Sequence, residues 1–339
     1  MWPKSRKHCL GTAAALVGAA LGVGAALLAA GLAGAVGPYP DLGSCPVFPA
    51  PPASLSPRAP SLPTEAAWNQ NISKAPRAHG SAKVIGYIDA HGGDAIHPDF
   101  GSPRAYGFPY AVVGAGAKKL PIHYIAYGSE SSRGPFPIPP NAPVEGGAHA
   151  DGDRHVLVVD HSACKLYELY DATFKGKPKP HWDAGSGVEW DLRSAALRPD
   201  GWTSADAAGL PIFPGLVGYE EAAAGQVSHA IRVTMDSTRN AWIHPASHCA
   251  GDTSSGAAPP MGLRLRLKAG YPLGGMGTAA RAIAVAMNEY GLIVADNGSN
   301  WYISGTSDRR WDDEELDALK AIPGSAFEVV RSAAAVRPC

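Results

Sequence analysis

The chain has 339 residues, with 29 Lys and Arg against 30 Asp and Glu, and a charged fraction of only 17%. Its 40 glycines and 31 prolines exclude a coiled coil or a helical bundle, because both residues break helices. Its 8 Trp, 12 Tyr and 7 Phe exclude a disordered chain, and the near-neutral charge balance gives no basic surface for nucleic acid. A loop-rich globular protein dominated by β-structure remains.

The N-terminus predicts export. Three basic residues within the first seven positions precede an uncharged, apolar run over 10–36, which is the layout of a secretory signal. We therefore expect a signal peptide or an N-terminal membrane anchor over 1–36, and a protein that is secreted or held at the cell surface. Cleavage stays open, because an Ala-Gly-Ala site at 33–35 would permit it and the run is also long enough to span a bilayer.

Proline content divides the rest of the chain. Residues 37–67 contain nine prolines, which predicts an extended linker. The globular domain is expected over 68–332, followed by a C-terminal tail at 333–339. An exported chain with an even number of cysteines after its apolar run forms up to two disulfides. We favour a bridge between the two internal cysteines, which leaves the outer two to pair; all three pairings of Cys45, Cys164, Cys249 and Cys339 stay open.

Apolar periodicity predicts the elements of the domain. Alternating apolar residues predict strands at 84–88, 122–127, 155–160, 165–170, 227–234, 263–268, 292–296 and 301–304. In the segment 263–268 the alternation predicts a basic face turned outward, and Asn297-Gly298 predicts a hairpin turn between the last two strands. Helices are predicted at 276–290 and 312–322. The fold class is mainly β with a few helices: a single β-sandwich or barrel-like domain with helical decoration.

The densest polar cluster of the sequence ends at a predicted buried strand. Asp153, Arg154 and His155 stand at the mouth of that strand. An imidazole beside a carboxylate suits acid–base catalysis, with Asp153 fixing the tautomer of His155. We therefore predict that Asp153 and His155 are catalytic and that Arg154 binds substrate. The alternative is a capped strand entry with a local Asp–Arg ion pair.

Two further catalytic candidates come from later segments. Asp206 lies in a Gly-rich segment, 201–215, and is predicted to be a second catalytic carboxylate. The alternative places it in the first turn of a short helix. His229 interrupts the strand expected at 227–234 and is predicted to assist the carboxylates; the alternative is a histidine satisfied within the sheet.

Aromatic and polar residues near predicted strand ends suggest substrate contacts. Tryptophans stack on sugar rings, and carboxylates and imidazoles bond to sugar hydroxyls. On this basis the predicted substrate-binding residues besides Arg154 are Trp202, His248, Asp296 and Trp301. The alternatives are a core position for Trp202 and a purely structural turn at 296–301.

The sequence predicts no resident cofactor and no committed metal ligands. Two metal alternatives stay open. Three histidines in different segments, His155, His229 and His248, suit zinc, and exposed carboxylates suit calcium. Nucleotide cofactors are disfavoured because no glycine-rich loop is followed by the helix and lysine that phosphate binding requires.

Several segments resemble a family of exported, mostly bacterial hypothetical proteins. The resemblance covers roughly residues 68–331 and is carried by 153–160 (DRHVLVVD), 164–170 (CKLYELY), 203–212 (TSADAAGLPI) and 295–305 (ADNGSNWYISG). It implies an exported single domain. It implies no particular activity, so no catalytic residue is transferred from it.

These patterns favour an exported carbohydrate-active enzyme, a glycoside hydrolase or lyase that uses Asp carboxylates with an assisting His. Its expected partner is a polysaccharide or cell-wall glycan, with no nucleic acid and with membrane contact only at the N-terminus. The first alternative is a non-catalytic cell-wall or glycan-binding surface protein. The second is a zinc-dependent hydrolase with the three-histidine site.

Overall fold

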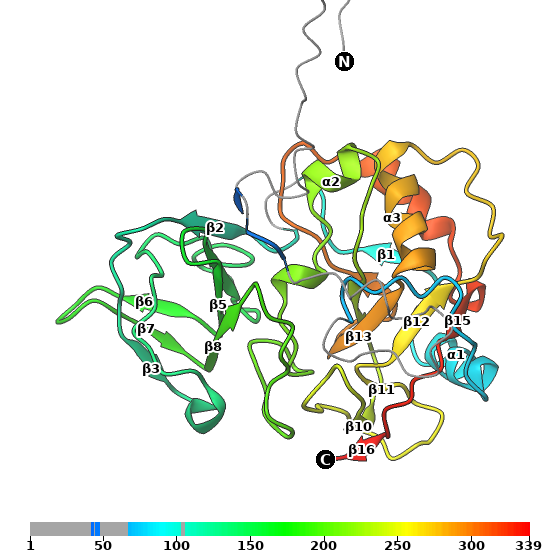
Figure 1. Cartoon of the computed structure of the whole chain (residues 1–339), viewed down its shortest axis with the longest axis horizontal. Coiled ribbons are helices and arrows are strands. Elements are labelled where there is room, and N and C mark those ends of the chain that lie inside the picture. The colour runs from blue at the N-terminus through cyan, green and yellow to red at the C-terminus, as the bar shows by residue number, and fades with distance from the viewer. Residues whose placement is uncertain (1–41, 44, 48–66, 103–105) are drawn as a thin grey trace, which may run out of the picture. The chain divides into compact units, whose positions relative to one another are not determined.

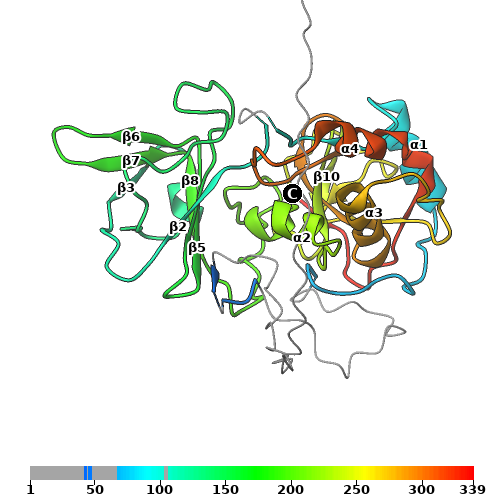
Figure 2. The ribbon, with the colours of Figure 1, turned by 90° about the horizontal axis from the view of Figure 1, so that it is seen from above.

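The structure is a computed structural model, and it describes residues 42–43, 45–47, 67–102 and 106–339. The predicted signal or anchor at 1–36 lies outside the described residues, as does most of the expected linker. The described part is mainly β with few helices, which confirms the predicted fold class. Its strands form four sheets, shown in two views in Figures 1 and 2. None of the helices in this part combines the length and apolar character needed to cross a bilayer.

The largest sheet has six strands and carries the main hydrophobic core. Its strand order is β1 (His97–Pro98), β14 (Tyr302–Ile303), β9 (Ile231–Met235), β13 (Leu292–Asn297), β12 (Arg264–Leu267) and β15 (Phe327–Val329). Helix α3 (Thr278–Glu289) leads from β12 to β13 and packs on the sheet through buried apolar residues such as Ala280, Ile283 and Met287. The predicted helix at 276–290 is therefore confirmed.

A second group of strands forms a four-stranded sheet and a three-stranded sheet, seen on the left in Figure 1. The four-stranded order is β2 (Tyr110–Val113), β4 (Val156–Asp160), β5 (Lys165–Tyr170) and β8 (Ser186–Asp191). The three-stranded order is β3 (Ile122–Tyr124), β7 (His181–Ala184) and β6 (Thr173–Lys175). In β4, Val156 and Val158 pack in one hydrophobic cluster, whereas Leu157 and Val159 pack in another. Both faces of this strand are buried, as its continuous apolar run predicts.

The remaining sheet contains the C-terminal strand, which directly precedes a disulfide-bonded cysteine, Cys339. It has the order β11 (Pro260–Met261), β10 (Arg239–Trp242) and β16 (Arg337–Pro338), so the expected tail at 333–339 supplies a strand. The disulfides join Cys45 to Cys164 and Cys249 to Cys339, with Cα separations of 5.4 and 6.2 Å. The favoured pairing is therefore wrong, because Cys45, inside the expected linker, packs on the domain beside the buried Leu42. Two disulfides indicate an oxidising, extracytoplasmic compartment.

The other helices are short. They are α1 (Ser81–Ala90), α2 (Tyr219–Ala223) and α4 (Asp313–Asp317), with 3-10 turns η3 (Gly128–Glu130), η4 (Phe213–Gly215), η5 (Ala318–Ala321) and η6 (Gly324–Ala326). Asp312 caps α4 by accepting hydrogen bonds from the first-turn N–H groups, as the acidic run predicts. The strand predicted at 84–88 is wrong. Ile85 and Ile88 are three positions apart and both face inward, which is the spacing of a helix face, because residues three apart in a strand point to opposite sides.

Two expectations about the large sheet are corrected. Asn297-Gly298 does not close a hairpin, because β9 lies between β13 and β14 and pairs with both. The arginines of β12 point inward rather than outward: Arg264 and Arg266 are only 6% and 7% exposed. Each donates to backbone carbonyls of the segment 67–75, which crosses this face of the sheet. The guanidinium groups are therefore buried and donate to backbone carbonyls, where the sequence predicted that they would face solvent.

Candidate functional site

A polar pocket of about 200 Å³ lies between the four-stranded and six-stranded sheets. Residues preceding β4, the start of β8, the loop at 203–207, the loop after β10 and the end of β13 all contribute to it. Five of the nine predicted site residues line this pocket: Asp153, His155, Asp206, His248 and Asp296. The other lining residues are Tyr127, Tyr170, Ser186, Thr203, Ser204, Ala205, Ala207 and Ala250.

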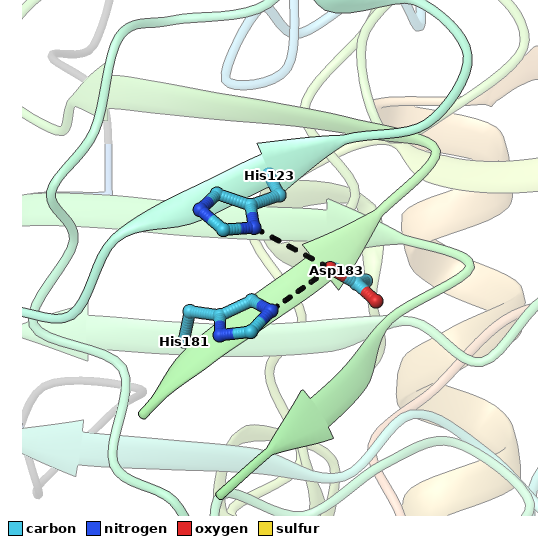
Figure 3. Close-up of side chains that lie close together, drawn as sticks. All are labelled: His123, His181 and Asp183. Atoms are coloured by element: carbon cyan, nitrogen blue, oxygen red, sulfur yellow. Dashed lines mark ion pairs between the residues drawn. The ribbon is translucent and has the colours of Figure 1, made fainter. Parts of the chain in front are cut away.

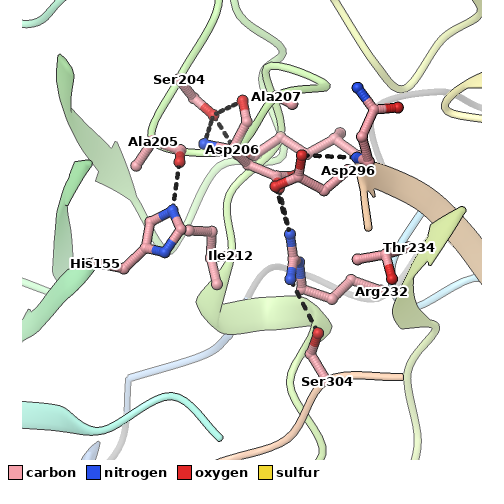
Figure 4. Close-up of polar contacts among 12 residues, drawn as sticks. His155, Ser204, Ala205, Asp206, Ala207, Ile212, Arg232, Thr234, Asp296 and Ser304 are labelled. Carbon is pink, nitrogen blue, oxygen red and sulfur yellow. Dashed lines mark hydrogen bonds and ion pairs between the residues drawn. The ribbon is translucent and has the colours of Figure 1, made fainter. Parts of the chain in front are cut away.

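Arg232 joins two of the pocket carboxylates (Figure 4). It belongs to β9 and its side chain is only 3% exposed. One guanidinium nitrogen, Nη2, lies 2.5 Å from Oδ1 of Asp206 and 3.4 Å from Oδ2 of Asp296. The other, Nη1, donates to the hydroxyl of Ser304 at 2.9 Å. A single buried cation therefore serves two carboxyl groups from different parts of the chain.

This arrangement changes the acidity of both carboxyls. Burial raises the pKa of Asp206 to about 7; Arg232 opposes the rise and the neighbouring Asp296 adds to it. Burial also raises the pKa of Asp296, again against the pull of Arg232. Oδ2 of Asp206 is buried and has no hydrogen-bond partner among the residues that the structure describes. One cation balances one carboxylate, so the pair as a unit holds a proton close to neutral pH.

His155 is a buried cation rather than a free base. Its Nε2 lies 2.9 Å from the carbonyl oxygen of Ala205, which only accepts, so Nε2 carries a proton. Its Nδ1 lies 2.6 Å from a carboxylate oxygen of Glu145. Burial lowers the pKa of His155, but the Glu145 carboxylate outweighs it and raises the pKa to about 9. Both nitrogens are therefore donors in the charged ring, and His155 is ion-paired with Glu145. Its predicted role in proton transfer stays a prediction.

The partner predicted for His155 also differs. Asp153 is exposed at the rim of the pocket, whereas Glu145, ten residues before the histidine, makes the direct contact. Arg154 donates to the carbonyl oxygens of Ala150 and Ala172. The alternative, a local Asp–Arg ion pair, is absent from the ion pairs of the described residues, and Arg154 lines two neighbouring surface pockets.

His248 is the pocket histidine whose second nitrogen is available. Nδ1 lies 2.8 Å from the carbonyl oxygen of Ala207 and must donate to it. In the neutral ring Nε2 then carries the lone pair, and no residue of the described chain donates to that atom. A histidine held in this tautomer at a pocket wall can accept a proton or a hydroxyl hydrogen bond from a ligand.

Besides Arg154, three predicted site residues lie outside the pocket: His229, Trp202 and Trp301. His229 is buried, with Nε2 2.9 Å from Glu221 and Nδ1 2.8 Å from the carbonyl of Ala230. Trp301 is fully buried against Phe327 and therefore has no face for a sugar ring. Trp202 is 37% exposed, but it stands beside Arg198 and away from the carboxylates.

Among the described residues, the three histidines of the zinc alternative do not form a group with the spacing of metal ligands. His155 and His229 are each engaged by a glutamate and a carbonyl, and His229 does not line the pocket that holds His155 and His248. Within the described residues, the group with the spacing of metal ligands is a different one, on β3 and β7.

Sequence reasoning missed Arg232, Glu145 and Glu168. Glu168 is fully buried in β5 and accepts from Nε1 of Trp190 and from the backbone N–H groups of Ile212 and Phe213. Burial raises its pKa to about 7 against these hydrogen bonds. The sequence does indicate that Arg232 and Glu168 are unusual, because each is a charged residue in the middle of an apolar strand pattern. Such a residue stays buried only where partners satisfy it.

Comparisons of the chain with family models, with curated proteins and with solved structures give no match. The chemistry of the pocket is therefore the basis for a functional proposal.

Proposed function

We propose that the chain is an exported hydrolase of carbohydrates whose proton donor is the Asp206–Asp296 pair. The observation that carries the proposal is the sharing of Arg232 by two carboxyls, one buried and one partly exposed, at the wall of a pocket. Glycoside hydrolysis needs one carboxyl that is protonated near the working pH and a second that is ionised. A pair that retains a proton supplies the first, and the exposed Asp153 on the same pocket supplies the second.

Within the pair, Asp296 is the group that meets substrate. Its side chain is 21% exposed, whereas the side chain of Asp206 is inaccessible. Asp206 then acts through Arg232, because it takes part of the cation's charge and so leaves Asp296 easier to protonate. His248 accepts a hydroxyl hydrogen bond at Nε2.

The pocket fits a neutral sugar best. Its volume of about 200 Å³ accommodates one small ring, and its polar wall consists of carboxyls, hydroxyls and imidazoles. The two cations at this wall, Arg232 and His155, are already paired with carboxylates, so they do not attract an anionic ligand such as a phosphate or a uronate. This argument favours hydrolysis over the lyase reaction, which acts beside a substrate carboxylate. Export is supported by the basic and apolar N-terminal sequence and by the two disulfides.

The test is release of reducing sugar from a panel of neutral plant, fungal and bacterial polysaccharides. We expect the wild-type chain to release sugar and Asp296→Asn to lower kcat at least about 100-fold, because the amide has no proton to give. Asp191→Asn is the matched control, since Asp191 pairs with Lys165 on the surface. Binding without product release would replace the hydrolase with a glycan-binding protein, and equal rates for the wild type and Asp296→Asn would remove the pair from the mechanism.

A second prediction separates Asp206 from Asp296. In Asp206→Asn, Arg232 is free to pair with Asp296 alone, so the pKa of Asp296 falls. A general acid works only while protonated, so the alkaline limb of the kcat profile should move to lower pH while activity at acid pH remains. The measurement is kcat from pH 4 to pH 9 for the wild type and the variant. An unchanged alkaline limb would show that Asp206 does not tune the acid.

A further inference from the structure

Two histidines and an aspartate meet on one face of the three-stranded sheet, outside the pocket (Figure 3). His181 and Asp183 are two residues apart on β7, so their side chains leave the same face, while the intervening Trp182 is buried on the other. His123 on β3 is the register partner of Asp183 in the parallel β3–β7 pair. The strand geometry itself therefore brings the three side chains together.

The distances suit a single ion between them. Oδ1 of Asp183 lies 3.3 Å from Nε2 of His181 and 3.8 Å from Nδ1 of His123. All three ligand atoms fall within 4.8 Å of one another. Ligands bound tetrahedrally to zinc at about 2.0–2.2 Å are separated by about 3.3–3.6 Å. A small ion is therefore reached by all three groups after minor side-chain rotation.

The hydrogen bonding of His181 directs its second nitrogen at another acceptor. Nδ1 of His181 lies 2.7 Å from the carbonyl oxygen of Lys179, which requires a proton on Nδ1. In the neutral ring, Nε2 then presents its lone pair to the carboxylate of Asp183, another acceptor. A histidine whose far nitrogen donates to a carbonyl is the usual arrangement of a metal ligand. Two facing acceptors need either a metal ion or an additional proton between them.

We propose that His123, His181 and Asp183 bind one divalent transition-metal ion, with Zn²⁺ as the physiological candidate. Imidazole and carboxylate ligands suit zinc, and three protein ligands leave a fourth position for water. The side chain of His123 is 61% exposed, so that position faces solvent. Lys175 on β6 competes for the site, because its ammonium lies 3.8 Å from the other oxygen of Asp183.

The test is calorimetric titration of the chelator-treated chain with ZnCl₂ at pH 7.5. We expect one zinc per chain, with affinity lowered at least about 10-fold in each of His123→Ala, His181→Ala and Asp183→Asn. His79→Ala, which changes an exposed histidine elsewhere, should bind as the wild type does. Lys175→Met should bind more tightly, and the affinity of the wild type should fall at pH 5.5, because the imidazoles must be deprotonated to bind.

Circular dichroism of each variant verifies that the fold is retained. Zinc-edge X-ray absorption of the complex should show two imidazole ligands with nitrogen at about 2.0–2.1 Å. Failure of the wild type to bind zinc would overturn the proposal in favour of a proton-bridged ion pair. Binding that survives all three substitutions would also overturn it, by placing the ion elsewhere.

Discussion

Substitution of Arg232 by methionine is expected to lower the free energy of unfolding by about 3–5 kcal/mol at pH 7.5. Methionine fills a similar volume but leaves Asp206 and Asp296 without their shared cation. The pKa values of both carboxyls then rise further in the folded state. A carboxyl whose pKa is higher in the folded than in the unfolded state favours folding only while it is protonated. As the pH rises above its pKa in the unfolded state, this contribution to stability is lost. The loss of stability in Arg232→Met should therefore be largest at alkaline pH. Urea unfolding at pH 5 and pH 8 measures it.

Two further variants make this prediction specific. Arg310→Met removes an exposed arginine that pairs with Asp308 and Glu220, and it should cost no more than about 1 kcal/mol. Adding Asp206→Asn and Asp296→Asn to Arg232→Met removes the stranded charges and should restore most of the lost stability. If the triple variant unfolds as readily as the single one, the loss comes from packing rather than from unpaired charge.

The second large effect concerns the ion pair between the buried His155 and the half-buried Glu145. Glu145→Gln should cost about 3 kcal/mol near pH 6, since the pair raises the pKa of His155 from 6.5 to about 9 and each unit corresponds to about 1.4 kcal/mol. In the wild type this contribution is complete below about pH 6.5 and is lost as pH rises toward 9. On the acid side it is lost as Glu145, whose pKa is lowered from 4.5, becomes protonated.

Urea unfolding of the wild type and Glu145→Gln from pH 4 to pH 9.5 measures this dependence. The two curves should converge at the alkaline end, where His155 is neutral in both proteins. Glu189→Gln is the matched control, because Glu189 pairs with Lys165 at the surface and should contribute less than about 1 kcal/mol. A constant difference between the two curves across this range would contradict a charged His155.

Much of the fold was predictable because periodicity reports burial. The run at 156–159 predicted a strand buried on both faces, and the apolar spacing at 276–290 predicted α3. The errors arose where long-range partners decide the outcome. The arginines of β12 alternate like a solvent-facing row, yet a segment from the start of the domain covers them. The alternation of residues within β12 contains no information about the segment 67–75, which covers these arginines and lies almost 200 residues away in sequence.

The same limit applies to the site. Asp153, His155, Asp206, His248 and Asp296 were selected for their places near strand ends, and the structure brings them to one pocket. Their roles were less predictable, since a histidine acts as a base or as a fixed cation according to its two partners. Glu145 and Arg232 determine those roles, and each reaches its partners only through tertiary structure. Sequence spacing favoured the nearer Asp153 instead.

The inward arginines of β12 also constrain the order in which the chain can fold. Arg264 and Arg266 bond to carbonyls that lie 191 to 197 positions earlier in the sequence. A chain that emerges from the ribosome N-terminus first exposes the segment 67–75, with Trp68 and Ile72, long before β12 exists to receive it. Contacts of such long range make folding slow. The carbonyl groups of this first segment therefore gain these partners only after β12 has been synthesised.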